Sequence, residues 1–250
     1  MCRQGIDDHV RMSRDGGLKW YESCMDVEII SAPAYALGKV TVPPGGGVRV
    51  QSGGMSIMQG DLTVDTTAHG GIMSGLKRSL GGASFFVNDF TSTTGGMVGV
   101  GPALPGDLTV INLSGTNSLL VQNHCWLASD LSIDVDSSWG GAKGFFSGAG
   151  LILLRCSGSG DLLLAGFGAI HKIDLTAGEV VTLDTGNVVA FDDTIVYNVR
   201  KAGGNWKTTL LGGEGLVTEF TGPGRLWWQT RSSSDLLNWI AQHTQTTRSS

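Results

Sequence analysis

A threefold internal repeat constrains the fold of this chain more than any other feature of its sequence. Three lysines, at positions 77, 143 and 207, recur at nearly equal intervals, and a hydroxyl residue follows each of them 14 positions later. These pairs are Lys77 and Thr91, Lys143 and Ser157, and Lys207 and Thr221. Self-similarity at a nearly fixed period is typical of structural units that stack or form a ring. The pattern therefore predicts three copies of one unit.

The segments upstream of these lysines align in the same way. Each of three strand-like segments ends in a glycine, and these glycines, at positions 45, 115 and 178, are spaced by about the same interval as the lysines. The segments are KVTVPPG (39–45), TVINLSG (109–115) and KIDLTAG (172–178). A unit of roughly 60 to 70 residues buries little apolar surface by itself, so we expect the copies to share a core.

Glycine usage and alternation favour an all-β fold. Glycine accounts for 39 of the 250 residues, and it separates short apolar runs rather than forming one tract. Its usual share is only about 7%, and spacing of this kind is typical of many short strands joined by tight turns. In the stretch 130–136, Leu131, Ile133 and Val135 alternate with polar residues, so they are expected to share one face of a strand.

The strand-like segments divide the chain into a leader, one β domain and a C-terminal tail. We expect three tandem modules in the β domain, each resembling a β-sandwich or a double-stranded β-helix. The predicted boundaries are 1–25 for the leader, 26–232 for the domain, 26–106, 107–168 and 169–232 for its modules, and 233–250 for the tail.

Two local expectations are specific enough to test. In the second module, strands are predicted over 150–156 and 161–166, separated by glycines. The tail is predicted to contain one short helix over 234–242, with Ser233 or Ser234 as its N-cap and Asp235 in its first turn.

The charge content limits the classes of partner. The net charge is −5, which argues against nucleic-acid binding because that function rests on clustered Lys and Arg. Charged residues make up only 16% of the chain, against about 25% in a typical protein. We therefore expect part of the surface to be buried in a homo-oligomer.

Cysteine usage and hydropathy favour a cytoplasmic protein. The four cysteines contain no CxxC pair, and the start MCRQGIDDHVRM lacks the apolar stretch of a signal peptide. The longest apolar stretch, over 162–170, is far shorter than the roughly 20 residues that span a bilayer. Peripheral association with a membrane is left open.

Several short motifs resemble those of the family named after altered inheritance of mitochondria. They are GLKR (75–78), PGD (105–107), GEGL (213–216), TGPGR (221–225) and QTR (229–231). The resemblance covers about residues 27 to 240. It implies a fold similar to the tryptophan RNA-binding attenuation protein, with β repeats wound around a pseudo-threefold axis. Bacterial members of the family are largely uncharacterised, and no catalytic residues follow from the resemblance.

Motifs for catalysis, cofactors and metals are weak. The segment 70–77 is a near miss to a phosphate-binding loop, but Leu76 separates the second glycine from Lys77. His69, His124 and His171 occupy different places in the three copies, whereas a metal site needs ligands that converge. We therefore expect no cofactor, no metal and no enzymatic activity.

The most distinctive polar segment is 225–231, which occurs in the third copy alone. Alternation is expected to put the odd-numbered residues, from Arg225 to Arg231, on one face, where they would stack on an aromatic, nucleotide or sugar ligand, and to put Leu226, Trp228 and Thr230 on the other. The other interpretation is a contact between modules or subunits, with Arg225 over Trp227 as a cation–π pair and Glu214 as an ion partner of Arg225. The candidate ligand or interface residues are Glu214, Arg225, Trp227, Gln229 and Arg231.

These observations favour an oligomeric β scaffold or interaction protein over an enzyme. The alternative is a small-ligand-binding module that uses the Arg225/Trp227 face.

Overall fold

A computed structural model describes residues 25–68, 86–136, 145–146, 151–201 and 216–244 of the chain. Strands dominate these residues and one α-helix follows them, so the all-β prediction is confirmed. Lys77, Lys143 and Lys207 lie outside the described residues.

The strands form three consecutive sets along the chain. The first set comprises β1 (Val27–Ile30), β2 (Leu37–Val42), β3 (Gly47–Gln51), β4 (Met55–Gly60), β5 (Thr63–Ala68), β6 (Phe86–Thr91) and β7 (Gly96–Val100). The second comprises β8 (Gly106–Ser114), β9 (Leu119–Gln122), β10 (Trp126–Asp130), β11 (Ile133–Asp136), β12 (Phe145–Phe146) and β13 (Leu151–Phe167). The third comprises β14 (Ile170–Leu175), β15 (Val180–Asp184), the 3-10 turn η3 (Thr185–Asn187), β16 (Val188–Asp192), β17 (Val196–Lys201), β18 (Leu216–Thr221) and β19 (Gly224–Gln229).

The same antiparallel pairing occurs in each set. In the first set, β7 pairs with β2 and β4, while β6 pairs with β3 and β5. In the third set, β19 pairs with β14 and β16, while β18 pairs with β15 and β17. In the second set, β13 takes both roles, because its C-terminal half pairs with β8 and β10 and its N-terminal half with β9 and β11.

The continuous strand β13 corrects the expectation of two strands over 150–156 and 161–166. The structure joins them into one strand of 17 residues that passes through Gly158 (φ 117°) and Gly160 (φ 149°). A Cβ added to Gly158 would lie 2.5 Å from the carbonyl oxygen of Ser132. Glycine therefore allows the strand to change partners here without a turn.

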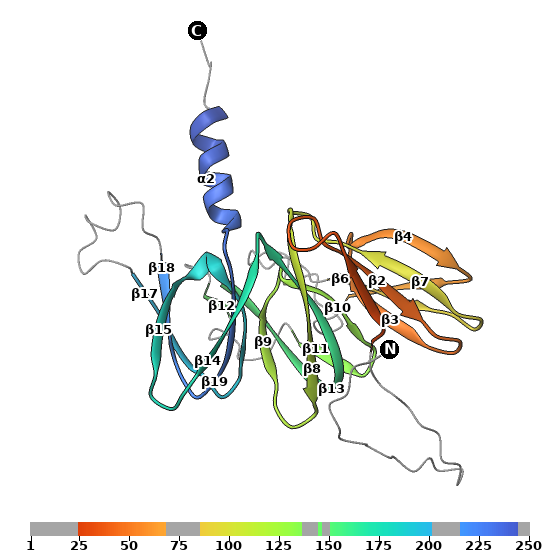
Figure 1. The fold of residues 1–250 in the computed structure, drawn as a ribbon, viewed down its shortest axis with the longest axis horizontal. Helices are drawn as coiled ribbons and strands as arrows, with labels where there is room; N and C mark the ends of the chain where they lie inside the picture. Colours follow the sequence, from red (N-terminus) through yellow and green to blue (C-terminus); the bar gives the residue numbers. More distant parts are fainter. Residues whose placement is uncertain (1–24, 69–85, 137–144, 147–150, 202–215, 245–250) are drawn as a thin grey trace.

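Neighbouring sets are joined through their strand edges. β10 of the second set pairs with β3 of the first, and β16 of the third pairs with β9 of the second. These pairs are part of a single 12-stranded sheet. Figure 1 shows the three sets side by side along the long axis, with the second set in the middle. Their relation by a pseudo-threefold axis stays a prediction.

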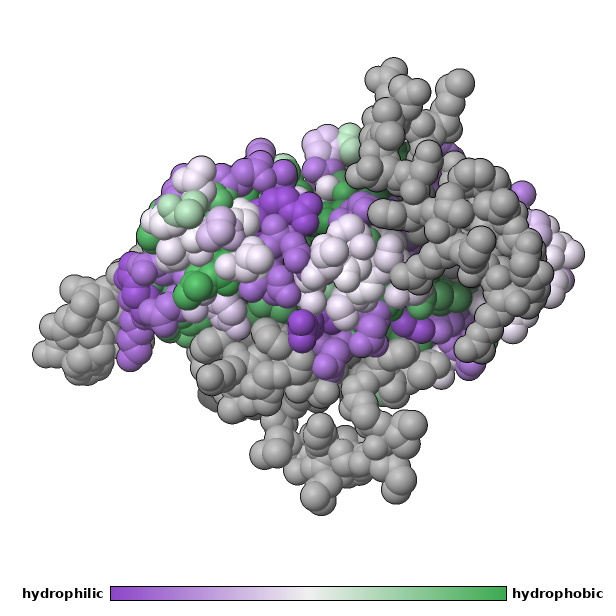
Figure 2. Space-filling view, turned by 90° about the horizontal axis from the view of Figure 1, so that it is seen from below, coloured by the Kyte–Doolittle hydropathy of each residue, from purple (hydrophilic) through white to green (hydrophobic). Residues whose placement is uncertain are grey.

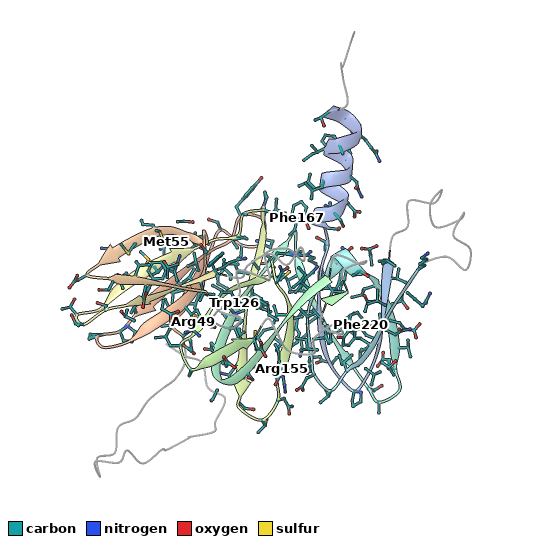
Figure 3. All side chains as sticks on the ribbon, turned by 180° about the vertical axis from the view of Figure 1, so that it is seen from behind. Arg49, Met55, Trp126, Arg155, Phe167 and Phe220 are labelled. Carbon is teal, nitrogen blue, oxygen red and sulfur yellow. The ribbon has the colours of Figure 1, made fainter. Side chains whose placement is uncertain are left out.

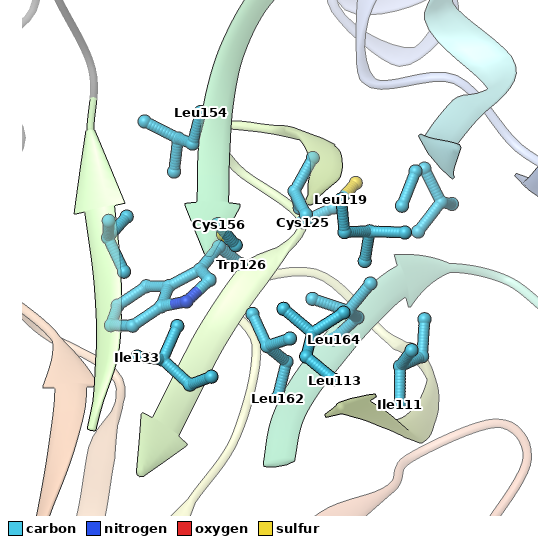
Figure 4. Packing of buried hydrophobic residues seen from close by; sticks show 14 of the residues in the cluster. Ile111, Leu113, Leu119, Cys125, Trp126, Ile133, Leu154, Cys156, Leu162 and Leu164 are labelled. Carbon is cyan, nitrogen blue, oxygen red and sulfur yellow. The ribbon is translucent and has the colours of Figure 1, made fainter. Parts of the chain in front are cut away.

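Three hydrophobic clusters form the core, and each contains side chains from more than one set. The middle cluster surrounds Trp126, which is 0% exposed (Figure 4). It also includes Val87 of the first set and Trp227 of the third. The cluster of the first set contains Leu163 of the second, and that of the third set contains Leu120 of the second. The sets therefore pack as one body.

The helix α2 (Ser233–Thr244) projects from this body, and none of its residues is buried (Figure 1). The backbone N–H of Asp235 donates to Oγ of Ser232 at 3.4 Å, so Ser232, rather than Ser233 or Ser234, occupies the N-cap position. Within the described part of the chain, no helix has the length and apolar character needed to cross a membrane.

Candidate functional site

An open hollow of about 420 Å³ lies beside the candidate residues Arg225 and Trp227. Strands β8 and β14 supply most of its lining, and β19 contributes Arg225 and Trp227. Asp107, His171 and Lys172 add polar groups to the wall. The hollow therefore collects groups of both charge signs around one arginine.

Arg225 is held by a carboxylate of the adjacent strand. Its Nε lies 2.9 Å from Oδ2 of Asp192 and its Nη2 lies 2.9 Å from Oδ1, which is a bidentate pair. The backbone N–H of Arg225 also donates to Oδ2 of Asp192 at 2.8 Å. The hydrogen bonds that its guanidinium donates to Asp192 raise the pKa of Arg225 above its ordinary value. The positive charge of Arg225 is therefore already compensated within the fold.

Asp192 takes the role that the sequence suggested for Glu214. Glu214 lies outside the described residues. Asp192 was missed because its partner is 33 positions away in the chain. In the structure the residue equivalent to Asp130 is Asp192, since Oδ2 of Asp130 accepts from the backbone N–H of Asp161 at 2.7 Å in the same way.

Trp227 lines the hollow, but most of its side chain is packed in the core. Its side chain is 5% exposed and belongs to the middle hydrophobic cluster. The guanidinium of Arg225 lies 5.1 Å from the centre of its ring, so the predicted cation–π pair is present. The next residue, Trp228, stacks on His171 with ring centres 4.9 Å apart.

Gln229 is fully buried, and both the oxygen and the nitrogen of its side-chain amide are hydrogen-bonded. Its Oε1 accepts from the backbone N–H of Phe167 at 2.8 Å, and its Nε2 donates to the carbonyl oxygen of Gly186 at 2.9 Å. Buried polar groups are normally satisfied in this way. Gln229 therefore ties the end of β13 to η3 and does not present its amide to a ligand in the hollow.

Arg231 lies beyond the end of β19 and is exposed. Its Nη1 donates to the carbonyl oxygen of Thr230 at 3.1 Å. The expectation of one exposed polar face over 225–231 is therefore corrected: the structure brings Arg225 and Trp227 to the hollow, buries Gln229 and separates Arg231 from them. Alternation correctly gave the faces of the strand, but it carries no information on which face another set of strands covers.

The described residues that line the hollow offer polar contacts, and the two described cysteines are buried in the middle cluster. Burial raises the pKa of the Cys125 and Cys156 thiols, and a protonated thiol is a poor nucleophile. In the described ranges, groups of three or more residues able to hold a metal ion are absent. Lys172 pairs with Asp174 at 2.8 Å at the mouth of the hollow.

Comparisons with known proteins agree with the fold. The family model described as mitochondrial biogenesis AIM24 matches residues 27–231. An uncharacterized protein from Streptococcus pyogenes serotype M6 is 28% identical over an alignment of 222 residues, which covers 85% of this chain and 88% of the relative. A crystal structure of a Streptococcus pyogenes protein superposes with a TM-score of 0.69 at 24% identity, and the match covers 88% of this chain and 99% of that one.

Proposed function

Because the chain belongs to the mitochondrial biogenesis AIM24 family, whose matched relative is itself uncharacterized, we propose its function from the geometry. We infer that the protein is an oligomeric β scaffold without catalytic activity, located in the cytoplasm.

The use of the candidate polar residues carries this proposal. The side chains of Asp192 and Gln229 form hydrogen bonds inside the fold, and Trp227 is buried in the core. The buried thiols of Cys125 and Cys156, with their raised pKa values, also favour a structural role. A protein that uses its distinctive polar groups to hold its own strands together is suited to assembly rather than turnover.

The low charge content supports assembly as well. Charged residues are 16% of the chain, and apolar side chains such as Met55, Ile57 and Met58 are exposed. Figure 2 shows small hydrophobic patches between hydrophilic residues on one face of the molecule. Apolar surface of this kind is often covered by another protein.

Light scattering coupled to size exclusion tests the proposal directly. At micromolar concentration we expect a mass that is a multiple of the mass of one chain. A monomeric mass at tens of micromolar would contradict the scaffold, whatever the activity of the protein.

The hollow beside Arg225 supports a second candidate, a small-ligand-binding module. Its volume lies within the range of about 300 to 1,000 Å³ that is usual for ligand sites. Native mass spectrometry with added tryptophan, AMP or glucose tests this function. A complex that is lost in Arg225→Ala but kept in Arg200→Ala, whose arginine pairs with Glu219 away from the hollow, would support it.

A further inference from the structure

Two strand edges are uncovered although their counterparts in the other sets are covered. β4 of the first set corresponds to β10 and β16, which are joined to a neighbouring set. β15 of the third set corresponds to β3 and β9, which receive those strands. Among the described residues, β4 pairs with β7 alone and β15 with β18 alone.

The correspondence of β4, β10 and β16 rests on a shared irregularity. Each pairs antiparallel with the last long strand segment of its set, and each shows a register shift near its start. The first residues after the shift are Ile57, Ala128 and Ala190. These three residues therefore occupy the same position in the three sets.

The correspondence of β3, β9 and β15 rests on their register within each set. Val48 lies opposite Phe90, Leu119 opposite Cys156, and Val181 opposite Phe220. Each of these partners comes directly before one of the repeated hydroxyl residues Thr91, Ser157 and Thr221. Two residues further along, Val50, Val121 and Leu183 are equivalent in the same register.

The two joints inside the chain have the same register. Ala128 lies opposite Val50 at the first joint, and Ala190 lies opposite Val121 at the second. All four side chains are 0% exposed. Both joints therefore have one register: the first residue after the shift (Ala128 or Ala190) lies opposite the equivalent residue of the neighbouring set (Val50 or Val121).

The uncovered edges have the composition of covered ones. All six residues of β4 are exposed, and Ile57, at the position of the buried Ala128 and Ala190, is 51% exposed. β4 contains no charged residue, and Asp184 is the only one in β15. Natural edge strands are usually protected by Lys, Pro or a bulge. The register shift in β4 gives no such protection, because β10 and β16 have the same shift and are paired nonetheless.

The two uncovered edges lie at opposite ends of one molecule, so they cannot pair within the chain. Figure 1 places β4 at one end of the row of sets and β15 at the other, and Figure 3 shows Met55 of β4 and Phe220 of β18 far apart. A contact between them therefore requires two copies of the chain.

We propose that β15 of one copy pairs antiparallel with β4 of a second copy, head to tail, and so continues the joint that already occurs twice inside the chain. The register of the two joints inside the chain then places Leu183 opposite Ile57, Thr182 opposite Met58 and Val181 opposite Gln59. This inference rests on the proposed scaffold function and adds the surface and the partner. Because the two surfaces differ, the contact generates a closed ring or an open filament.

A charge-swap experiment at one opposed pair tests this contact. Thr182 and Met58 are both exposed in the single chain, and in the proposed register they face each other on the same side of the sheet. Like charges directly opposite each other destabilise a strand pair, and opposite charges stabilise it. The double variant Met58→Lys/Thr182→Lys is expected to weaken assembly at least tenfold, whereas Met58→Glu/Thr182→Lys assembles like the wild type.

The matched control is Val196→Lys on β17. Val196 is 70% exposed, and β17 corresponds to β5 and β11, whose outer edges are unpaired in every described set. The control is expected to assemble normally. Masses are measured by native mass spectrometry and light scattering over a dilution series, and circular dichroism checks that each variant is folded.

The outcomes separate this inference from the proposed function. If the wild type is oligomeric and the Lys/Lys variant remains equally oligomeric, the head-to-tail joint is wrong while the scaffold stands. If the wild type is monomeric at tens of micromolar, both fail.

Hydrogen exchange on the wild type gives a second test that needs no variant. On dilution below the assembly concentration, the amides of β4 and β15 are expected to lose protection while those of β5 do not. Unchanged protection of β4 and β15 across a range in which the mass falls would overturn the joint.

Discussion

β10 and β4 occupy the same position in the pairing pattern, yet their burial is opposite. Four of the five residues of β10 are buried, whereas all six residues of β4 are exposed. Both strands are largely apolar, and both have the same register shift. The difference arises from the neighbouring set, because β3 covers the outer edge of β10 and nothing within the described chain covers that of β4. Burial in this fold is therefore decided by the joints between sets.

The largest expected effect compares Trp126 with Met55, the residues directly before the shift in β10 and β4. Trp126→Ala removes a side chain that is 0% exposed, so the free energy of unfolding should fall by about 4 kcal/mol. Met55→Ala, at a side chain that is 42% exposed, should change it by less than about 0.5 kcal/mol in dissociated protein. Urea denaturation at low protein concentration measures both values. Similar losses in the two variants would show that burial does not distinguish the strands.

The second prediction concerns the tie that Gln229 makes between β13 and η3. Gln229→Ala leaves the N–H of Phe167 and the carbonyl oxygen of Gly186 without this partner in a partly buried place. Each unsatisfied group costs about 1 to 3 kcal/mol, so we expect a loss of about 3 kcal/mol. The control Arg231→Ala, at an exposed side chain two residues away, should fall within about 0.5 kcal/mol of the wild type. Thermal unfolding of the two variants in parallel distinguishes them, and equal midpoints would refute the structural role of Gln229.

The third prediction extends the comparison to the strand ends, where Asp192 of β16 corresponds to Gln59 of β4. Asp192→Ala removes a bidentate pair with Arg225 and a hydrogen bond to its backbone N–H. Because the Arg225 side chain is 39% exposed, the expected loss of stability is modest, about 1 to 2 kcal/mol. Gln59→Ala on the uncovered strand should cost much less. A loss for Gln59→Ala as large as that for Asp192→Ala would contradict the assigned roles.

Local sequence signals predicted the strands well. The alternating stretch 130–136 contains β11, in which Ile133 and Val135 are buried, because alternation acts over a few residues. β13 was predicted as two strands, since Gly158 and Gly160 give the same signal for a turn as for a bend within a strand.

Contacts between distant segments could not be read from the sequence. Gln229 was predicted as a ligand contact because alternation shows which residues share a face but not which segments pack on that face. Its side chain is in fact hydrogen-bonded to residues 43 and 62 positions away. Asp192 was missed for the same reason, since only the register of β16 against β19 shows that it faces Arg225. The cation–π pair of Arg225 and Trp227 was found because both residues lie on one strand at a spacing of two.

The smallest expected effect concerns α2, which contrasts with a covered strand such as β10 because none of its residues is buried. Deleting residues 233–250 keeps Ser232, which is 3% exposed, and removes no member of the three hydrophobic clusters. The midpoint of thermal unfolding of the β domain should therefore shift by no more than about 1 °C, since about 1 kcal/mol corresponds to roughly 2 to 4 °C in a domain of this size. Light scattering should also give the same oligomeric mass as the full chain, because the proposed joint uses β4 and β15 alone. A truncated protein that unfolds several degrees earlier would show that the helix stabilises the β domain, and one that dissociates would place α2 at the contact between copies.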